Sequence, residues 1–193
     1  MSEINGKKIE LDTSLDAPAG VIEAARKVEM IVMDVDGVLT DGHTYQLNSG
    51  EQFLCFSAAD GTALAFCAEV GLSLAVISGR DLEAARIRMG RFPMAEMHFG
   101  CANKEIVLLE MSRRLRIPCE RMAYIGDDLN DLPIMARVGL PVAVPNAVPE
   151  VIRAAAYCTS KAGGEGAVRE LITLVLKARG LYEKAVEKYL REH

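Results

Sequence analysis

The feature that most constrains the fold of this chain is a series of short, uninterrupted apolar runs, each followed by a segment with helical periodicity. Runs of this kind lie at Met30–Met33, Leu72–Ile77, Met122–Ile125 and Leu140–Val144. They are too short for buried helices, and they lack the apolar–polar alternation of strands that face water on one side. Strands buried on both faces and separated by helices form a parallel sheet with helices on either side. The sequence therefore predicts a doubly wound α/β domain.

One segment departs from this alternation. In His43–Phe56, two short runs of β-forming residues flank Asn48-Ser49-Gly50, a turn signal that is typical of a hairpin. The fold class is thus α/β, a Rossmann-like parallel sheet with a small β-hairpin insert. The other expected elements are helices at Val21–Val28, Thr62–Val70, Asp81–Met89, Lys104–Leu115, Leu129–Val138, Pro149–Ala154 and Glu165–Lys177, short strands at Met97–Phe99 and Ala156–Thr159, and an amphipathic tail at Leu181–Leu190.

The length and composition fit one globular domain. The chain has 193 residues, half of them hydrophobic, which is enough for a full core. We interpret residues 1–193 as a single domain with a polar leader (1–18), the hairpin (43–56) and a C-terminal tail (181–193). The net charge of −5 gives no electrostatic footprint for nucleic acid or an anionic membrane surface. No apolar run approaches the length of a bilayer span, so neither kind of partner is expected.

The cysteines indicate a reducing environment. They are five in number, and no two have the CxxC spacing of a redox or zinc motif. Free thiols in the cytoplasm are the simplest interpretation, so we expect a cytoplasmic protein in which no cysteine is the nucleophile. The residues are Cys55, Cys67, Cys101, Cys119 and Cys158.

Polar side chains gather just after the expected strands, where parallel sheets bind their ligands. The run IVMDVDGVLTDG ends in carboxylates, and later strands are followed by a hydroxyl, an ammonium group and further carboxylates. Carboxylates this close together repel one another unless a counter-charge or a shared proton is present. Such a set can hold a divalent cation and a phosphate together. The residues are Asp34, Asp36, Ser78, Gly79, Arg80, Lys104, Asp127, Asp128 and Asp131.

Four stretches resemble, in order, the four motifs of the haloacid dehalogenase superfamily of aspartate-nucleophile phosphatases: DVDGVLTDG, ISGR, Lys104 and GDDLND. The resemblance covers nearly the whole chain from about Met30. Further stretches are similar to the 3-deoxy-D-manno-octulosonate 8-phosphate (KDO 8-phosphate) phosphatases and their sialic-acid-pathway relatives: NSGEQF in the hairpin, Asp60-Gly61, GGEGAVRE and the tail GLYEKAVEKYL. The segments after Asp36 and Lys104 are too short for a cap domain, so the capless subclass is expected.

The resemblance implies a magnesium-dependent phosphatase that works through an aspartyl-phosphate. Asp34 would be the nucleophile, and Asp36 would be the general acid and then the general base. Ser78 would hydrogen-bond the phosphoryl group, and Lys104 would neutralise its charge and hold the nucleophile. Mg²⁺ would be bound by Asp34, by Asp127 and by the backbone carbonyl of Asp36.

The neighbours of these residues have less specific expected roles. Asp128 and Asp131 are candidates for an outer shell around the metal, although Asp128 fits equally well as a helix N-cap. Arg80, with Gly79, is either a substrate-carboxylate ligand or an ordinary surface arginine. Asp60 and Gly61 are further candidates for substrate binding. The family usually has arginine where this chain has Ala59, so one contact to an acidic sugar is expected to be missing.

The expected substrate is a phosphorylated 3-deoxy-2-keto sugar acid, such as KDO 8-phosphate in lipopolysaccharide biosynthesis. A nine-carbon, sialic-acid-type 9-phosphate is the alternative substrate. A non-enzymatic receiver-type signalling domain also uses acidic residues, a hydroxyl and a lysine at strand ends, but its phospho-acceptor aspartate follows a mid-chain strand.

The resemblance also implies an assembly. It predicts a homotetramer whose hairpins meet near the centre and whose tails reach neighbouring active sites. Apolar side chains alternate along the hairpin, and one chain offers too little sheet to cover both of its faces. These side chains are Tyr45, Leu47, Phe53, Leu54 and Phe56.

Overall fold

The centre of the molecule is a six-stranded, all-parallel sheet, seen in a computed structural model that describes residues 2–4 and 7–192. The strand order is β10–β9–β8–β3–β6–β7. This arrangement confirms the predicted doubly wound α/β class. The strands are β3 Met30–Met33, β6 Ser73–Ile77, β7 Glu96–His98, β8 Met122–Gly126, β9 Leu140–Ala143 and β10 Tyr157–Cys158.

Strand β3 lies at the point where the winding of the sheet reverses. It pairs with β6 on one side and β8 on the other, with Met33 opposite both Val76 and Ile125. This register brings the residues that follow the three strands to one edge of the sheet. In doubly wound sheets the reversal opens a crevice at the carboxyl ends of the strands, where ligands bind.

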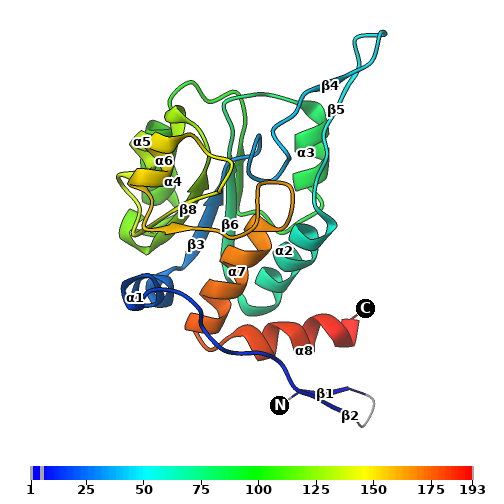
Figure 1. Cartoon of the computed structure of the whole chain (residues 1–193), viewed down its shortest axis with the longest axis vertical. Coiled ribbons are helices and arrows are strands. Elements are labelled where there is room, and N and C mark those ends of the chain that lie inside the picture. Colours follow the sequence, from blue (N-terminus) through cyan, green and yellow to red (C-terminus); the bar gives the residue numbers. More distant parts are fainter. Residues whose placement is uncertain (1, 5–6, 193) are drawn as a thin grey trace.

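Helices cover both faces of the sheet (Figure 1). Helices α1, α2 and α7 pack together on one face, and α4, α5 and α6 pack together on the other. Among the described residues, no helix combines the length and apolarity needed to cross a membrane. The helices are α1 Ala19–Lys27, α2 Ala58–Val70, α3 Glu83–Met89, α4 Lys104–Leu115, α5 Leu132–Met135, α6 Pro149–Ala154, α7 Ala167–Ala178 and α8 Tyr182–Glu192, with 3₁₀ turns at Cys119–Arg121 and Leu129–Asp131.

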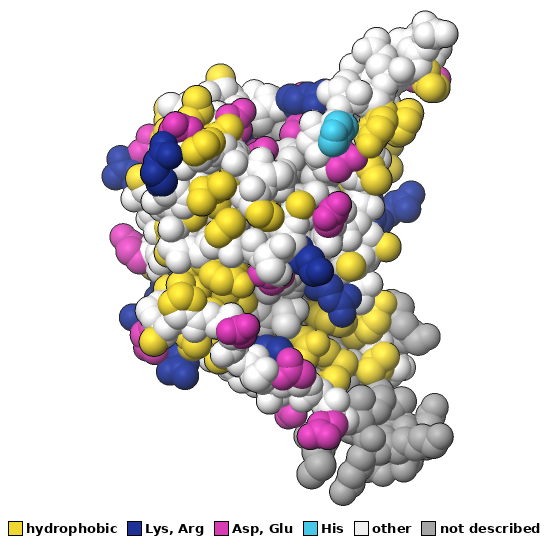
Figure 2. Space-filling view, in the orientation of Figure 1, with side chains coloured by type: hydrophobic (Ala, Val, Ile, Leu, Met, Phe, Trp, Pro, Cys, Tyr) yellow, Lys and Arg dark blue, Asp and Glu magenta, His cyan; other side chains and the backbone are white. Residues whose placement is uncertain are grey.

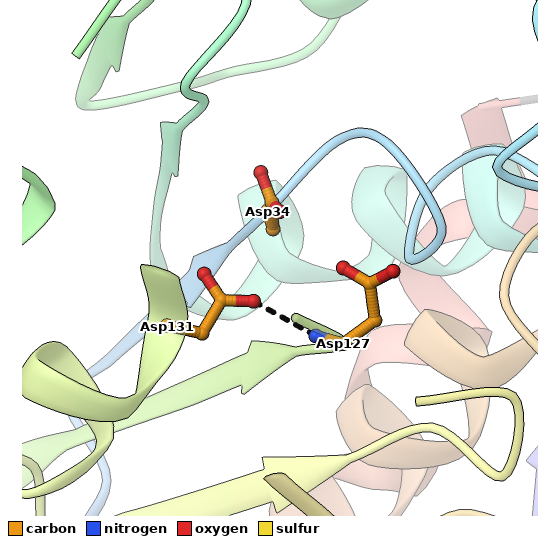
Figure 3. A group of neighbouring side chains, drawn as sticks. All are labelled: Asp34, Asp127 and Asp131. Atoms are coloured by element: carbon orange, nitrogen blue, oxygen red, sulfur yellow. Dashed lines mark hydrogen bonds between the residues drawn. The ribbon is translucent and has the colours of Figure 1, made fainter. Parts of the chain in front are cut away.

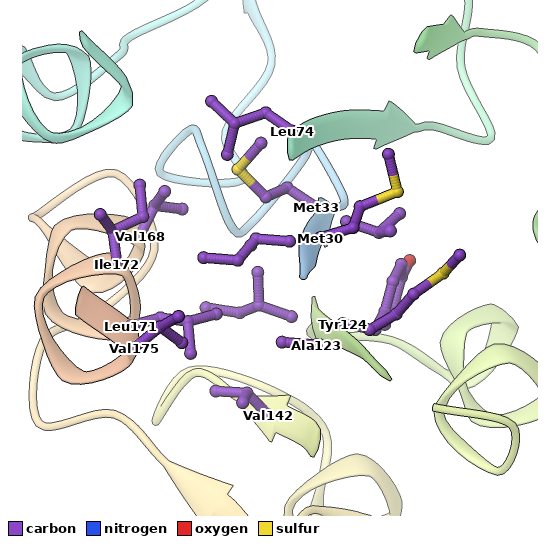
Figure 4. Packing of buried hydrophobic residues seen from close by; sticks show 14 of the residues in the cluster. Met30, Met33, Leu74, Ala123, Tyr124, Val142, Val168, Leu171, Ile172 and Val175 are labelled. Carbon is purple, nitrogen blue, oxygen red and sulfur yellow. The ribbon is translucent and has the colours of Figure 1, made fainter. Parts of the chain in front are cut away.

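The core holds β3 rigidly. All four of its residues are fully buried. The apolar face of α7 packs against the sheet, and its side chains there are Val168, Leu171, Ile172 and Val175 (Figure 4). Burial of such side chains contributes roughly 1.5–3 kcal/mol each relative to exposure. The first residue beyond β3, Asp34, therefore starts from a fixed backbone position. All five cysteines are free, as the sequence predicted.

Two helices differ from their predicted bounds by more than two residues at one end or both. Helix α2 begins at Ala58 rather than Thr62, because the Ser57 hydroxyl accepts a hydrogen bond from the Asp60 N–H and caps it. The helix predicted over Leu129–Val138 is a 3₁₀ turn followed by the single-turn α5. Pro133 lacks an N–H and fits only the first helical turn, so α5 starts at Leu132.

The leader and the insert each contain two short antiparallel strands. Residues 1, 5 and 6 of the predicted leader lie outside the described residues, and the described part pairs β1 (Ser2–Ile4) with β2 (Lys7–Ile9). In the insert, β4 (Tyr45–Gln46) pairs with β5 (Gln52–Phe53) and stands out from the body as an arm (Figure 1). The rings of Tyr45 and Phe53 stack, with 4.8 Å between their centroids.

The C-terminal tail packs on its own chain. In α8, Ala185 and Val186 are buried. The Tyr189 ring packs edge to face against the Phe66 ring of α2, with 5.2 Å between the ring centroids. Figure 1 shows α8 at the end of the molecule opposite the β4–β5 arm. Because α8 covers part of α2, its removal is expected to lower the stability of the fold. The predicted reach of the tail to a neighbouring subunit stays a prediction.

Asp60 and Gly61 do not line the crevice, and their predicted role in substrate binding stays a prediction. The Asp60 carboxylate is buried, and its Oδ1 accepts a hydrogen bond from the Arg169 N–H of α7 at 2.7 Å. Its Oδ2 has no hydrogen-bond partner in the described part of the chain. Gly61 lies against Arg88 and Phe92. Asp60 therefore joins α2 to the N-terminus of α7, and burial raises its pKa from 3.8 to about 6.

The raised pKa of Asp60 predicts a pH-dependent stability. Between about pH 4 and 6 the folded protein keeps a proton on Asp60 that the unfolded chain has released, so this group's contribution to the free energy of unfolding falls as the pH rises. The fall is at most about 3 kcal/mol. Asp60→Asn stays neutral and should lose less stability than the parent protein between pH 4.5 and 7, measured by urea denaturation. Asp16→Asn, at an exposed position, is the control. Equal pH dependence of parent and Asp60→Asn would contradict this prediction.

Candidate active site

A polar cavity of about 240 Å³ opens at the carboxyl ends of β3, β6 and β8. It brings together residues that are up to 96 positions apart in the sequence, and most of them belong to the set that the strand-end pattern predicted to meet. Its lining residues are Asp34, Asp36, Gly37, Gly42, Gly79, Arg80, Asp127, Asp128 and Asn130.

Asp34 lies at the bottom of this cavity and is almost fully buried. Its N–H donates to the Ile125 carbonyl, which continues the sheet pairing one residue beyond β3. One carboxylate oxygen accepts a hydrogen bond from the Val35 N–H at 2.7 Å, and the other lies 2.9 Å from Lys104 Nζ. Burial raises the pKa of Asp34 to about 7, against the opposing effect of Lys104. More positive charge near Asp34 would favour its ionised form.

Lys104 is the buried cation of the site. It is the first residue of α4, whose N-cap Asn103 accepts a hydrogen bond from the Ile106 N–H. Its ammonium group lies between Asp34 and Asp131, 2.6 Å from the latter. Burial alone would lower the pKa of Lys104, but the two carboxylates raise it above its usual value. Lys104 therefore stays charged.

Asp131 uses all of its acceptor positions inside the protein. Its Oδ1 accepts hydrogen bonds from Lys104 Nζ and from the Tyr124 hydroxyl, both at 2.6 Å. Its Oδ2 accepts from the N–H groups of Asp127 at 2.8 Å and Asp128 at 3.2 Å (Figure 3). A carboxylate has about four lone-pair positions, and these four donors occupy them. Asp131 therefore orients Lys104 and the turn after β8 and has no lone pair left for a ligand.

Tyr124 is a member of this network that the sequence analysis missed. Its side chain is fully buried in β8, and its hydroxyl accepts a hydrogen bond from Lys104 Nζ at 3.3 Å while it donates to Asp131. In the sequence, Tyr124 is part of an apolar run and reads as an ordinary core residue. Only the pairing of β8 beside β3 shows that its polar end points to the site.

The carboxylates of Asp34, Asp127 and Asp131 form a cluster that could hold a metal ion. Each offers an oxygen within 4.8 Å of the others (Figure 3). Burial, together with Asp34 and Asp131, raises the pKa of Asp127 to about 7. Three carboxylates against one ammonium group leave an excess of negative charge. Since the acceptors of Asp131 are already occupied, Asp34 and Asp127 are the side chains left to bind a hard divalent cation.

Asp36 and Arg80 form an ion pair at the rim, with Arg80 Nη1 2.7 Å from Asp36 Oδ1. The predicted substrate-carboxylate ligand therefore contacts the predicted acid–base residue. Ser78 is buried next to Gly79, and its hydroxyl accepts a hydrogen bond from the Arg80 N–H at 3.2 Å. Asp128 caps the following 3₁₀ turn through a capping box with Asp131, which agrees with the N-cap alternative for this residue.

The comparisons with known proteins agree with this geometry. The model of a family described as haloacid dehalogenase-like hydrolase matches residues 91–171. The chain is 39% identical over 167 residues to the KDO 8-phosphate phosphatase KdsC of Escherichia coli strain K12, covering 86% of this chain and 89% of that protein.

Solved structures of similar proteins have the same fold. The KDO 8-phosphate phosphatase of Yersinia pestis has a TM-score of 0.83 and 36% identity, over 86% of this chain and 89% of that one. The corresponding enzyme of Moraxella catarrhalis, solved with magnesium, phosphate and KDO, has a TM-score of 0.84 and 31% identity, over 88% of this chain and 97% of that one. Fold and site thus define a haloacid dehalogenase-type hydrolase. Within that superfamily, the chain belongs to the family of the KDO 8-phosphate phosphatases.

The free carboxylate of Asp127 leads to a prediction about cation binding. Asp127→Asn should abolish Mg²⁺ binding measured by isothermal titration calorimetry without substrate, because it removes one of the two available carboxylates. Asp16→Asn is the control, since this carboxylate is exposed and is not part of the cavity lining. Equal binding by the parent protein and Asp127→Asn would show that the cation lies elsewhere.

The raised pKa values of Asp34 and Asp127 predict that the affinity for Mg²⁺ depends on pH. Both are about 7, so at lower pH protons compete with a cation for the same oxygens. The affinity of the parent protein for Mg²⁺ should therefore rise between pH 6 and pH 8, with proton release on binding. The heat of titration in buffers of different ionisation enthalpy measures the released protons. An affinity that does not change over this range would contradict the prediction.

Proposed function

We propose that this protein is a magnesium-dependent phosphatase that hydrolyses KDO 8-phosphate to KDO and phosphate through an aspartyl-phosphate. The observation that carries this proposal is the buried Asp34 carboxylate, held by Lys104 at 2.9 Å beside the open carboxylate of Asp127. The 39% identity to the Escherichia coli enzyme supports the substrate. The Moraxella catarrhalis structure, with magnesium, phosphate and KDO, supports both the cofactor and the sugar acid.

In the first step a carboxylate oxygen of Asp34 forms a bond to phosphorus. The bond between phosphorus and the ester oxygen breaks, and a proton passes from the Asp36 carboxyl to that oxygen, which gives the free sugar acid. Lys104 keeps Asp34 in place and supplies fixed positive charge next to it. Asp36 must first leave its ion pair with Arg80 and take up a proton, because the paired carboxylate has none to give.

In the second step a water molecule attacks phosphorus and loses a proton to Asp36. The bond between phosphorus and Asp34 breaks, so phosphate leaves and both aspartates return to their starting states. One residue serves both steps because the group that gave a proton to the alkoxide is then free to take one from water. Gly79 borders the space that the phosphoryl group would occupy, and the buried Ser78 directly precedes it.

Asp34 and Asp127, with the Asp36 carbonyl, are the proposed ligands of Mg²⁺. Their oxygen donors and the excess negative charge of the site suit this ion. A bound Mg²⁺ supplies the positive charge that lets an anionic nucleophile meet an anionic phosphate ester. The cytoplasmic location expected from the free cysteines stays a prediction.

We also propose that the active form is a homotetramer in which the β4–β5 arms contact one another. Leu47 and Phe53 on the arm are about half exposed, at 51% and 50%. Figure 2 shows hydrophobic side chains on this arm, most of them near its base. A two-stranded hairpin is marginal by itself in water, so a second copy would stabilise it.

The mechanism predicts the effect of changing the nucleophile. Asp34→Asn should remove phosphatase activity on KDO 8-phosphate, a loss of at least about 10³-fold, because an amide is a far weaker nucleophile. The fold should persist, since the replacement has the same shape. Phosphate release and thermal unfolding measure the two effects. The same assay, run with a nine-carbon keto-sugar-acid 9-phosphate and glucose 6-phosphate, tests the substrate. Retained turnover in Asp34→Asn would refute the mechanism, and equal rates on the three esters would refute the substrate.

The assembly predicts the effect of charging the arm. The double variant Leu47→Glu, Phe53→Glu should shift the mass in solution from tetramer toward monomer, because buried charges at an interface are costly. Light scattering coupled to size-exclusion chromatography at micromolar concentration measures this change. Ile87→Glu, at an exposed residue of α3, is the control and should leave the mass unchanged. A monomeric parent protein with full activity would refute the tetramer.

A further inference from the structure

The Gly163-Gly164 segment lies directly against the loop that carries Asp36. A side chain at Gly163 would overlap the carbonyl oxygen of Gly37, and the Gly164 N–H donates a hydrogen bond to the Val38 carbonyl at 3.0 Å. A side chain at Gly164 would lie 2.5 Å from the Asp41 nitrogen. The two glycines therefore permit a close contact between backbones. They are more than a flexible entrance to α7.

Asn146 ties these two backbones together. It comes from a third part of the chain, the connection between β9 and α6. Its Nδ2 donates to the Gly37 carbonyl at 3.1 Å, and its Oδ1 accepts from the Gly163 N–H at 2.8 Å. One amide side chain thus satisfies a backbone acceptor of the Asp36 loop and a backbone donor of the glycine segment.

Gly37 is held from the other side as well. Its N–H donates to Thr40 Oγ1 at 3.3 Å, and the same hydroxyl donates to the Val35 carbonyl at 3.2 Å. Gly37 has a positive φ of 76°, and a side chain there would overlap the Asp127 carboxylate. Both polar groups of the Gly37 backbone are therefore fixed, directly after Asp36.

We propose that Asn146, supported by Gly163, is a positioning residue that fixes the Asp36–Gly37 backbone so that Asp36 can exchange a proton with the ester oxygen. The inference rests on the proposed function, in which Asp36 gives that proton. Asn146 acts through Asp36 and touches neither the nucleophile Asp34 nor its cation Lys104. Its loss should therefore impair proton donation by the Asp36 side chain, and the rates are compared at saturating Mg²⁺ because the Asp36 carbonyl is also a proposed ligand of this ion.

Leaving groups of different basicity separate this role from a general effect on structure. A sugar alkoxide is strongly basic and needs a proton as the bond to phosphorus breaks, whereas p-nitrophenolate leaves without one. In the first turnover the leaving group is released when the aspartyl-phosphate forms, before Asp36 is needed as a base. Release of the sugar acid thus reports on attack by Asp34 together with proton donation, and release of p-nitrophenolate reports on the attack alone.

The experiment compares the first-turnover rates of Asn146→Ala and the parent enzyme by rapid quench. We expect the rate on KDO 8-phosphate to fall about 10- to 100-fold, within the range that general acid catalysis contributes. We expect the rate on p-nitrophenyl phosphate to change less than about threefold, which leaves most of the loss specific to the basic leaving group. Gly163→Ala should show the same pattern, because its methyl group pushes on the Gly37 carbonyl.

Matched variants control for loss of stability. Gly20→Ala adds a methyl group where no atom lies within 4 Å, and Ser112→Ala removes a side-chain hydrogen bond to a backbone carbonyl far from the site. Both should leave the ratio of the two rates unchanged. Equal losses on the two esters in Asn146→Ala, or no loss on either, would overturn the inference. A parent enzyme that hydrolyses neither ester would refute the proposed function instead.

Discussion

The ammonium group of Lys104, buried between Asp34 and Asp131, is the interaction on which the site depends. A buried charge is costly unless it is paired and hydrogen-bonded, and removal of one partner leaves the other uncompensated. The parallel sheet brings Asp34 and the GDDLND turn to one edge, and the start of α4 delivers Lys104 between them. The register of β3 against β8 thus decides whether the three charges meet. The hydrophobic core between α7 and these strands therefore also fixes the positions of the three charges.

The hydrogen bonds that each carboxylate accepts determine its role in the site. Asp131 is saturated by four donors from its own chain, and so it is a structural anion. Asp34 keeps one oxygen toward Lys104 and one toward a backbone N–H, while no donor in the described part of the chain hydrogen-bonds the Asp127 side chain. Burial is the main reason that the pKa values of Asp34 and Asp127 are raised to about 7. A bound cation would favour the ionised form of both carboxyl groups.

The sequence predicted the strands and the strand-end residues well, because both follow from one rule. Short, uninterrupted apolar runs between helices indicate buried strands, and the carboxyl ends of parallel strands meet at one edge. The positions of Asp34, Lys104 and Asp127 therefore followed without any distance being known. Contacts between side chains obey no such rule. The pairing of Asp36 with Arg80, 44 residues away, and of Asn146 with Gly37, 109 residues away, depends on loop shapes. The polar end of Tyr124 was hidden because its ring fits an apolar run. The sequence also does not distinguish a carboxylate that joins two helices, as Asp60 does, from one that binds a ligand.

The loop after β3 links the chemistry to the arm. Within eight residues it holds the nucleophile, the proposed acid, a glycine with positive φ and the Thr40 hydroxyl that ties the turn. Thr40 also pairs with Phe56 at the base of the arm, so the two ends of the insert are joined directly beside the site. Asn146 and the Gly163-Gly164 segment brace the same loop from the side of α7. If arms contact one another in a tetramer, a displacement of the arms would reach this loop at Thr40. Asn146 holds the same loop at Gly37, which lies between Thr40 and Asp36. A brace at Gly37 would thus let a capless enzyme use its insert for assembly without moving Asp36.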